Sequence, residues 1–201
     1  MRRLLGPIAW LLVLASFALP FLAGPSAPPD PDGIPAATAA YTGFDLAYGG
    51  TADLLIPEWQ LDGTFVLVEP SDQDMYGAPQ PPLGGSTYGI VALTLIGLGL
   101  IAALLPVARH RAIVTASAAL LASLAVLALE FGRRAEVAQQ FAVLLLGAPI
   151  SPPPQPGIVE LAIGFWITMS LLLVIGFVHV ALAVPDQRKA EAVTDSAQGT
   201  A

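Results

Sequence analysis

Residues 88–129 read YGIVALTLIGLGLIAALLPVARHRAIVTASAALLASLAVLAL, two uncharged apolar runs on either side of the triplet Arg109-His110-Arg111. A helix needs about 20 apolar residues to cross the hydrocarbon core of a bilayer. The runs 88–108 and 112–129 both fall within the usual range of length for such a helix. We therefore expect two transmembrane helices joined by a tight cytoplasmic turn at residues 109–111.

Two more apolar runs flank this pair. Residues 4–23 follow Arg2 and Arg3, so segment 1–23 is expected to be the first span, and residues 158–184 are expected to be the fourth. Of the 201 residues, 55% are apolar and only 11% are charged, which leaves too few polar residues to cover a water-soluble fold of this size. These features predict an all-α membrane protein, a four-transmembrane-helix bundle solvated by the lipid bilayer.

The first apolar run has a second interpretation, a cleaved signal peptide. Its length exceeds the roughly 7–15 apolar residues usual in such a peptide. The best small-residue cleavage site, Pro25-Ser26-Ala27, is followed by Pro28, which is a poor position for cleavage. We therefore favour an uncleaved membrane anchor.

The basic residues predict the orientation, because cytoplasmic loops of membrane proteins are enriched in Lys and Arg. With both termini in the cytoplasm, six basic residues lie inside and two outside. The inner six are Arg2, Arg3, Arg109, Arg111, Arg188 and Lys189, and the outer two are Arg133 and Arg134. We expect a multi-pass protein of the plasma membrane with a disordered cytoplasmic tail at residues 185–201.

Residues 24–87 then form an extracytoplasmic loop domain that is acidic throughout. It contains nine acids and no Lys, Arg or His; the acids are Asp30, Asp32, Asp45, Asp53, Glu58, Asp62, Glu69, Asp72 and Asp74. Its two ends are rich in Pro and Gly, which is typical of extended linkers.

Two pieces of this domain are expected to be ordered. Residues 42–49 predict a short helix with Thr42 as N-cap, Asp45 at the third position and Gly49 as the stop. Residues 58–69 predict a β-hairpin around the turn Asp62-Gly63, a pair that favours a type I′ turn. That turn would pair Trp59 with Val66 and Leu61 with Thr64.

One face of this hairpin is a candidate partner contact. It would carry Trp59, Leu61, Val66 and Val68. A lone two-stranded hairpin is marginally stable in water. The apolar face is therefore expected to be covered by the short helix, by the membrane surface or by another protein.

Residues 130–157 form the second outer loop. Phe131, Ala135, Ala138 and Leu145 recur at helical spacing, which predicts an amphipathic interfacial helix or a shallow re-entrant segment. Residues 151–157, SPPPQPG, predict a stiff polyproline connector into the fourth span.

No residue pattern in the sequence indicates catalysis or a cofactor. The interiors of the four expected spans hold no Asp, Glu, Lys or Arg, whereas pumps and ion-coupled carriers place such groups at membrane depth. Cysteine is absent, and Asp30-Pro31-Asp32-Gly33 does not continue into a calcium-binding loop. His179 lacks a partner in the sequence and is more typical of packing than of a haem ligand. We expect no enzyme activity, no cofactor, no metal and, from the net charge of −7, no nucleic-acid binding.

Two resemblances accompany this pattern. The layout of a basic start, a span, a large outer loop and three more spans is similar to that of claudin-type proteins, without their paired cysteines or Gly-Leu-Trp motif. Leu19-Pro20-Phe21 and residues 41–49, YTGFDLAYG, more closely resemble uncharacterised four-span membrane proteins of high-GC bacteria. Neither resemblance implies an activity.

The leading functional hypothesis is a non-catalytic integral membrane subunit, or partner protein, of a larger membrane complex. Charge-free spans and an outer loop that needs cover both fit this role. The alternative is a small transporter or channel component that acts as a homo-oligomer. A third possibility, an enzyme that uses Glu58 and Glu69 as an acid–base pair, has less support because no substrate site accompanies these residues.

The charge distribution generates a prediction about topology. Because the chain has no cysteine, Ser71→Cys and Ser196→Cys each introduce a unique thiol. An impermeant thiol reagent applied to whole cells should label the variant at position 71 and leave the variant at position 196 unlabelled. The opposite pattern would show that the chain is inverted.

Overall fold

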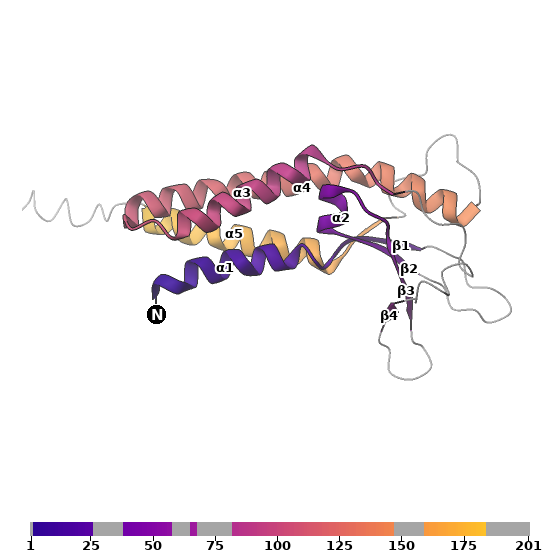
Figure 1. The fold of residues 1–201 in the computed structure, drawn as a ribbon, viewed down its shortest axis with the longest axis horizontal. Helices are drawn as coiled ribbons and strands as arrows, with labels where there is room; N and C mark the ends of the chain where they lie inside the picture. The colour runs from indigo at the N-terminus through magenta and orange to yellow at the C-terminus, as the bar shows by residue number, and fades with distance from the viewer. Residues whose placement is uncertain (1, 26–37, 58–64, 68–81, 147–158, 184–201) are drawn as a thin grey trace, which may run out of the picture.

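The fold is that of a computed structural model, which describes residues 2–25, 38–57, 65–67, 82–146 and 159–183. The helices are α1 (Arg2–Ser16), α2 (Gly43–Tyr48), α3 (Thr87–Ala103), α4 (Ala108–Leu146) and α5 (Ile163–Ala183). The strands are β1 (Pro20–Pro25), β2 (Thr38–Thr42), β3 (Asp53–Pro57), β4 (Phe65–Leu67) and β5 (Glu160–Leu161). Helices α1, α3, α4 and α5 run side by side, and the strands gather at one end of this bundle (Figure 1). We call this the sheet end and the opposite end the far end.

The described part of the chain is mostly helical with a small sheet, which agrees with the helical character of the expected class. Helices α4 and α5 are both long and apolar enough to cross a membrane. Helices α1 and α3 are apolar but have only 15 and 17 residues, fewer than the roughly 20 of a standard span. Two possible spans are therefore evident by length and composition, and the count of four stays a prediction.

Helix α1 is shorter than the sequence suggested, because it ends at Ser16 and not near residue 23. Pro20 explains the stop, since a proline disfavours helix at the residue before it and lacks an N–H of its own. The backbone N–H groups of Phe17 and Leu19 donate to carbonyls three residues back, at 3.2 and 3.1 Å, which tightens the chain before β1 begins.

Helix α4 also differs from the expected boundaries. It begins at Ala108, so Arg109, His110 and Arg111 lie in its first turn and not in a separate loop. It then continues without a break to Leu146, so the predicted interfacial segment after residue 129 is part of the same helix. No proline interrupts residues 108–146. At about 1.5 Å per residue its 39 residues span about 58 Å, nearly twice the thickness of a bilayer core.

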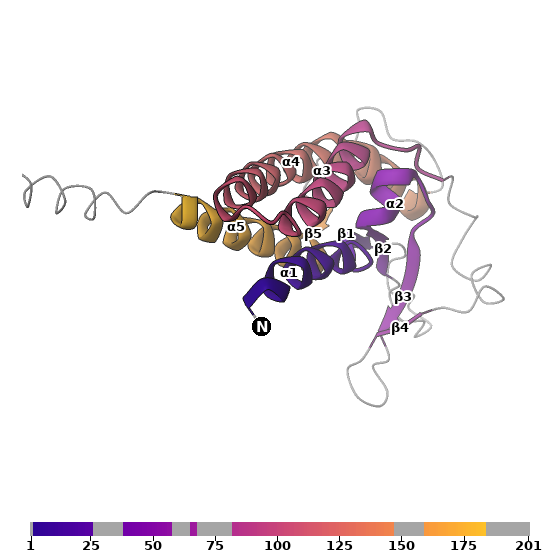
Figure 2. The same cartoon turned by 60° about the vertical axis from the view of Figure 1, so that its left-hand side comes forward.

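The sheet is larger than the expected hairpin. Its five strands have the order β4-β3-β2-β1-β5, and each strand is antiparallel to its neighbours. Strands β5 and β1 lie beside the helices, whereas β3 and β4 project away from them (Figures 1 and 2).

The predicted hairpin register was wrong. Val66 pairs with Ile56 of β3, not with Trp59, and Leu67 pairs with Leu55. Residue Leu55 also pairs with Thr38 of β2, so β3 is aligned by a strand on each side. Pairing with β2 is a constraint on β3 that a hairpin prediction from the turn alone leaves out; Asp62-Gly63 itself lies outside the described residues.

The short helix α2 confirms its predicted capping pattern. The Thr42 hydroxyl oxygen accepts from the Asp45 N–H at 3.1 Å, and the Thr42 N–H donates to Asp45 Oδ2 at 2.9 Å. Gly49 ends the helix with φ of +91°, a conformation that glycine adopts without strain.

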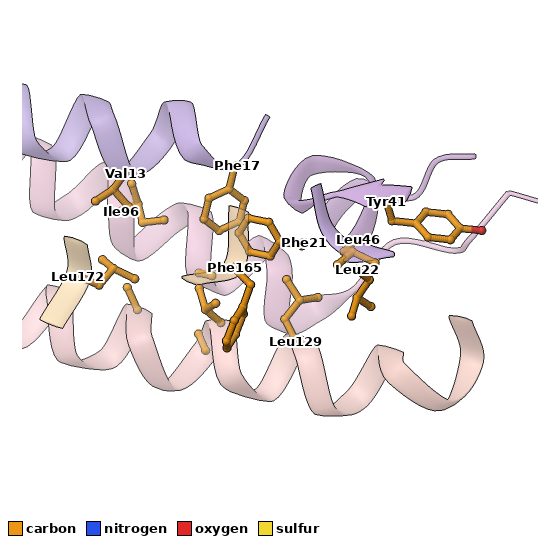
Figure 3. Packing of buried hydrophobic residues seen from close by; sticks show 14 of the residues in the cluster. Val13, Phe17, Phe21, Leu22, Tyr41, Leu46, Ile96, Leu129, Phe165 and Leu172 are labelled. Atoms are coloured by element: carbon orange, nitrogen blue, oxygen red, sulfur yellow. The ribbon is translucent and has the colours of Figure 1, made fainter. Parts of the chain in front are cut away.

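The core runs through the helices into the base of the sheet. Phe17, Phe21 and Phe165 meet there, with ring centroids 5.0 Å apart for the first pair and 6.3 Å apart for Phe21 and Phe165 (Figure 3). The hydroxyl groups of Ser16 and Thr168 share a hydrogen bond of 2.5 Å and join α1 to α5. The aromatic cluster therefore connects α1, β1 and α5.

Small residues on α3 allow α1 to approach. Trp10 of α1 is fully buried, and a Cβ added to Gly99 would lie 2.2 Å from its ring. A Cβ added to Gly97, two residues earlier on the same helix, would meet nothing within 4 Å. The contact between α1 and α3 thus depends on position 99 and not on glycine content alone.

This difference predicts unequal effects of the same substitution at the two positions. Gly99→Val should force Trp10 from its site and lower the free energy of unfolding by about 1–3 kcal/mol, the usual cost of overpacking. Gly97→Val is the matched control and should leave stability nearly unchanged. Thermal unfolding of both variants in mild detergent tests this, and equal midpoints would contradict the close packing at Gly99.

Candidate functional site

The strand β4 is the outer edge of the sheet and holds one predicted contact residue, Val66, at its centre. It pairs with β3 on one side, and no described strand pairs with its other side. An edge strand presents N–H and C=O groups that can pair with another chain. Trp59, Leu61 and Val68, the other predicted contact residues, lie outside the described residues.

The sheet is attached firmly to α4. Tyr41 of β2 is fully buried, and its hydroxyl donates to Gln140 Oε1 on α4 at 2.5 Å. In Figure 3 this hydroxyl points away from the apolar cluster around Leu22 and Leu46. Burial, followed by the negative charges of Asp45 and Glu136, raises the pKa of Tyr41 above its ordinary value. The hydroxyl therefore keeps its proton and can donate this hydrogen bond.

Two arginines of α4 hold the chain segments that enter α3 and β5. Arg134 Nη2 donates to the backbone carbonyl of Val159 at 2.8 Å. Arg133 donates to the backbone carbonyl of Gly84 and forms an ion pair with Glu136. In the sequence these arginines stand out only as exceptions to the charge rule. Their structural role depends on carbonyls 25 and 49 residues away, which no local pattern indicates.

Glu130 is the most unusual group at this end of the molecule. Its side chain is 3% exposed, and neither carboxyl oxygen has a hydrogen-bond partner among the described residues. A buried polar group without a hydrogen bond costs roughly 1–3 kcal/mol, and more if it is charged. Arg134 follows one helical turn later, but its guanidinium hydrogen bond goes to Val159. The sequence placed Glu130 at the end of a span without indicating its burial.

Acidic side chains dominate the rest of the described sheet end. Burial raises the pKa of Asp53 above its ordinary value, and the negative charge of nearby Asp45 raises it further. The described residues of the loop domain contain no Lys or Arg. The surface around the sheet therefore carries a negative field that attracts basic groups.

The two histidines do not form a site within the described residues. His179 Nδ1 donates to the carbonyl of Ile175 on its own helix at 2.9 Å, and His110 is exposed in the first turn of α4. In the described ranges, no group of three or more His, Asp or Glu side chains is arranged to hold a metal ion.

Comparison with known proteins assigns no family to the chain. No family model matches the sequence, and no curated protein is significantly similar to it. What the protein does must therefore follow from its own contacts, burial and charge.

The buried carboxyl generates a stability prediction. Glu130→Gln keeps the shape of the side chain and removes its charge, so it should raise the free energy of unfolding by about 1 kcal/mol. Glu160→Gln on β5 is the control, because Glu160 is exposed, and it should change stability little. Thermal unfolding in detergent at neutral pH measures both. A lower midpoint for Glu130→Gln would indicate that the carboxylate has a favourable partner.

Proposed function

We propose that this protein is a four-span plasma-membrane protein that acts as a non-catalytic subunit or partner of a larger membrane complex. In this proposal, the helices anchor it and the sheet end recognises another protein. The observation that carries the proposal is the outer edge of β4, which no described strand covers, in a sheet joined to the helices.

The exposed side chains of the bundle favour a lipid environment. Leu5 of α1, Ile101 of α3, Leu124 of α4 and Leu182 of α5 are 65%, 64%, 62% and 70% exposed. Apolar faces on four adjacent helices exceed what a water-soluble monomer usually exposes. At about 22 and 26 Å, α1 and α3 span most of a bilayer core.

The junction between α1 and β1 is compatible with a bundle that lies in the membrane. Backbone polar groups near lipid must be paired within the protein. Strand β1, which follows α1, pairs with β2 on one side and with β5 on the other. This double pairing supports placing β1 at the membrane surface.

The charges support an orientation with the far end in the cytoplasm. Arg109 and Arg111 lie at the far end with the start of α1, whereas the acids Asp45 and Asp53 lie at the sheet end (Figure 1). Arg133 and Arg134 would lie on the outer side in this orientation. Both donate hydrogen bonds to backbone carbonyls, so they are weak evidence against it. Both termini would then be cytoplasmic and the sheet extracytoplasmic.

The proposed mode of recognition is addition of a strand to β4. In that mode backbone hydrogen bonds provide affinity, and side-chain pockets provide specificity. The acidic field favours a partner with basic side chains. Trp59, Leu61 and Val68, close to β4 in sequence, would supply apolar anchors around Val66. A second copy of the chain could occupy the same edge, which would give a homo-oligomer.

Glu130 favours a second candidate function, a small transporter or channel component. A buried carboxyl without a hydrogen-bond partner can exchange a proton or bind a cation more readily than one held in a network. The two functions differ in what Glu130→Gln should do in cells. A stabilised and fully functional variant supports the partner role, whereas loss of function at a normal protein level supports transport.

The open edge generates a prediction about complex formation. Val66→Lys places a charge at the centre of β4, a change that opposes strand addition. We expect the partner to bind roughly thirtyfold more weakly, the effect of losing one strong contact residue. Co-purification of the native complex in gentle detergent, with quantification of the partner, measures the effect.

Thr51→Lys is the matched control, because Thr51 is an exposed residue of the same domain before β3. It adds the same charge and should retain the partner. Trp59→Ala is a second test that does not alter β4. Full retention of the complex by both Val66→Lys and Trp59→Ala would refute recognition at this edge.

A further inference from the structure

The far end of the bundle contains a cavity of about 740 Å³. Residues of α1, α3, α4 and α5 line it, so all four long helices contribute. Helices α1 and α4 each pack on both α3 and α5. The cavity therefore lies where these four helices meet. Its volume lies within the range of about 300–1,000 Å³ typical of ligand pockets.

The space exists because small residues face one another there. Gly6 and Ala9 of α1, Ala103 of α3, Ala112 of α4 and Ala183 of α5 all line the cavity. Closer to the sheet, large side chains such as Trp10, Ile96 and Leu172 are buried and fill the interior. The bundle is therefore packed in its middle and hollow at its far end.

The polar groups of the cavity are positive or neutral. Arg109 and Arg111 of α4 and His179 of α5 line it, and no Asp or Glu is among its described lining residues. Arg111 Nη1 donates to the carbonyl of Leu105 at 3.3 Å. The Arg109 guanidinium makes no hydrogen bond or ion pair with any described residue. The amino-terminal end of α4 adds the positive end of a helix dipole.

We propose that this cavity binds one anionic phospholipid. The apolar side chains would surround an acyl chain, and the Arg109 and Arg111 guanidinium groups would bind the headgroup phosphate. Arginine suits this role because its planar guanidinium can bind two phosphate oxygens at once. The apolar cavity wall lies next to arginines whose charge no described lining residue balances. This combination fits an amphiphile better than a water-soluble anion, which would leave the apolar wall uncovered.

The position of the arginines supports a membrane lipid as the source. They lie in the first turn of a helix long enough to cross a bilayer, where a phosphate headgroup layer would meet the bundle. The His179 imidazole also lines this cavity. Because its Nδ1 donates to Ile175, only Nε2 is left to meet an occupant. The proposal depends on the membrane location and not on recognition at β4.

The test uses the full chain purified in mild detergent and titrated with dioctanoyl phosphatidylglycerol or dioctanoyl phosphatidylcholine. Native mass spectrometry counts the bound lipid. We expect one phosphatidylglycerol per chain, bound at least tenfold more tightly than phosphatidylcholine. Arg109→Gln combined with Arg111→Gln should abolish this preference. Ala9→Phe, which adds a ring to the cavity wall, should weaken binding of both lipids.

Two controls keep the result specific. Arg188→Gln combined with Lys189→Gln removes the same charge from the C-terminal segment and should leave binding unchanged. Val66→Lys should also leave it unchanged, so failure of the partner proposal and failure of the lipid proposal are distinguishable. Equal binding of the two lipids, or an equal effect of the two charge-removing pairs, would overturn the proposal. It would also be overturned if the chain bound phosphatidylglycerol only after removal of residues 184–201, because that segment would then be the occupant.

Discussion

The pairing of β1 with both β2 and β5 is the constraint on which the rest of the structure depends. Leu22 pairs with Tyr41 on one side and with Leu161 on the other, and the Ala162 N–H donates to the Phe21 carbonyl at 2.8 Å. One short strand thereby joins the end of α1, the acidic loop and the start of α5. Because β1 leads directly out of α1, the loop domain is part of the same packed unit as the helices.

Helix α4 connects the bundle to the sheet. One half packs with α3 and α5, and the other half extends along the sheet. Arg133 and Arg134 bind backbone carbonyls of two distant segments, and Gln140 accepts from buried Tyr41. The sheet is thereby joined to α4 through β1 and β2, whereas β4 at its outer edge is paired with β3.

The two ends of the molecule have opposite chemical character, and the proposals follow from this contrast. The sheet end is acidic and presents a strand edge that no described strand covers, which suits a basic polypeptide. The far end has two arginines beside an apolar cavity whose described lining contains no Asp or Glu, which suits an anionic amphiphile. Between them, Trp10, Ile96, Leu129 and Leu172 fill a largely apolar interior. Glu130 near the sheet end, whose carboxyl oxygens have no hydrogen-bond partner among the described residues, is the observation behind the alternative proposal of transport.

The sequence alone determined what depends on neighbours along the chain. The apolar runs indicated the long helices, and Thr42, Asp45 and Gly49 indicated α2 with its caps, because capping bonds join residues three or four apart. Tertiary structure decided what depends on distant segments. The end of α1 at Ser16, the register of β3 on β4, the burial of Glu130 and the carbonyl partners of Arg133 and Arg134 all required the folded chain. Each depends on contacts between parts of the chain that only the fold brings together, and the cavity between four helices depends on them in the same way.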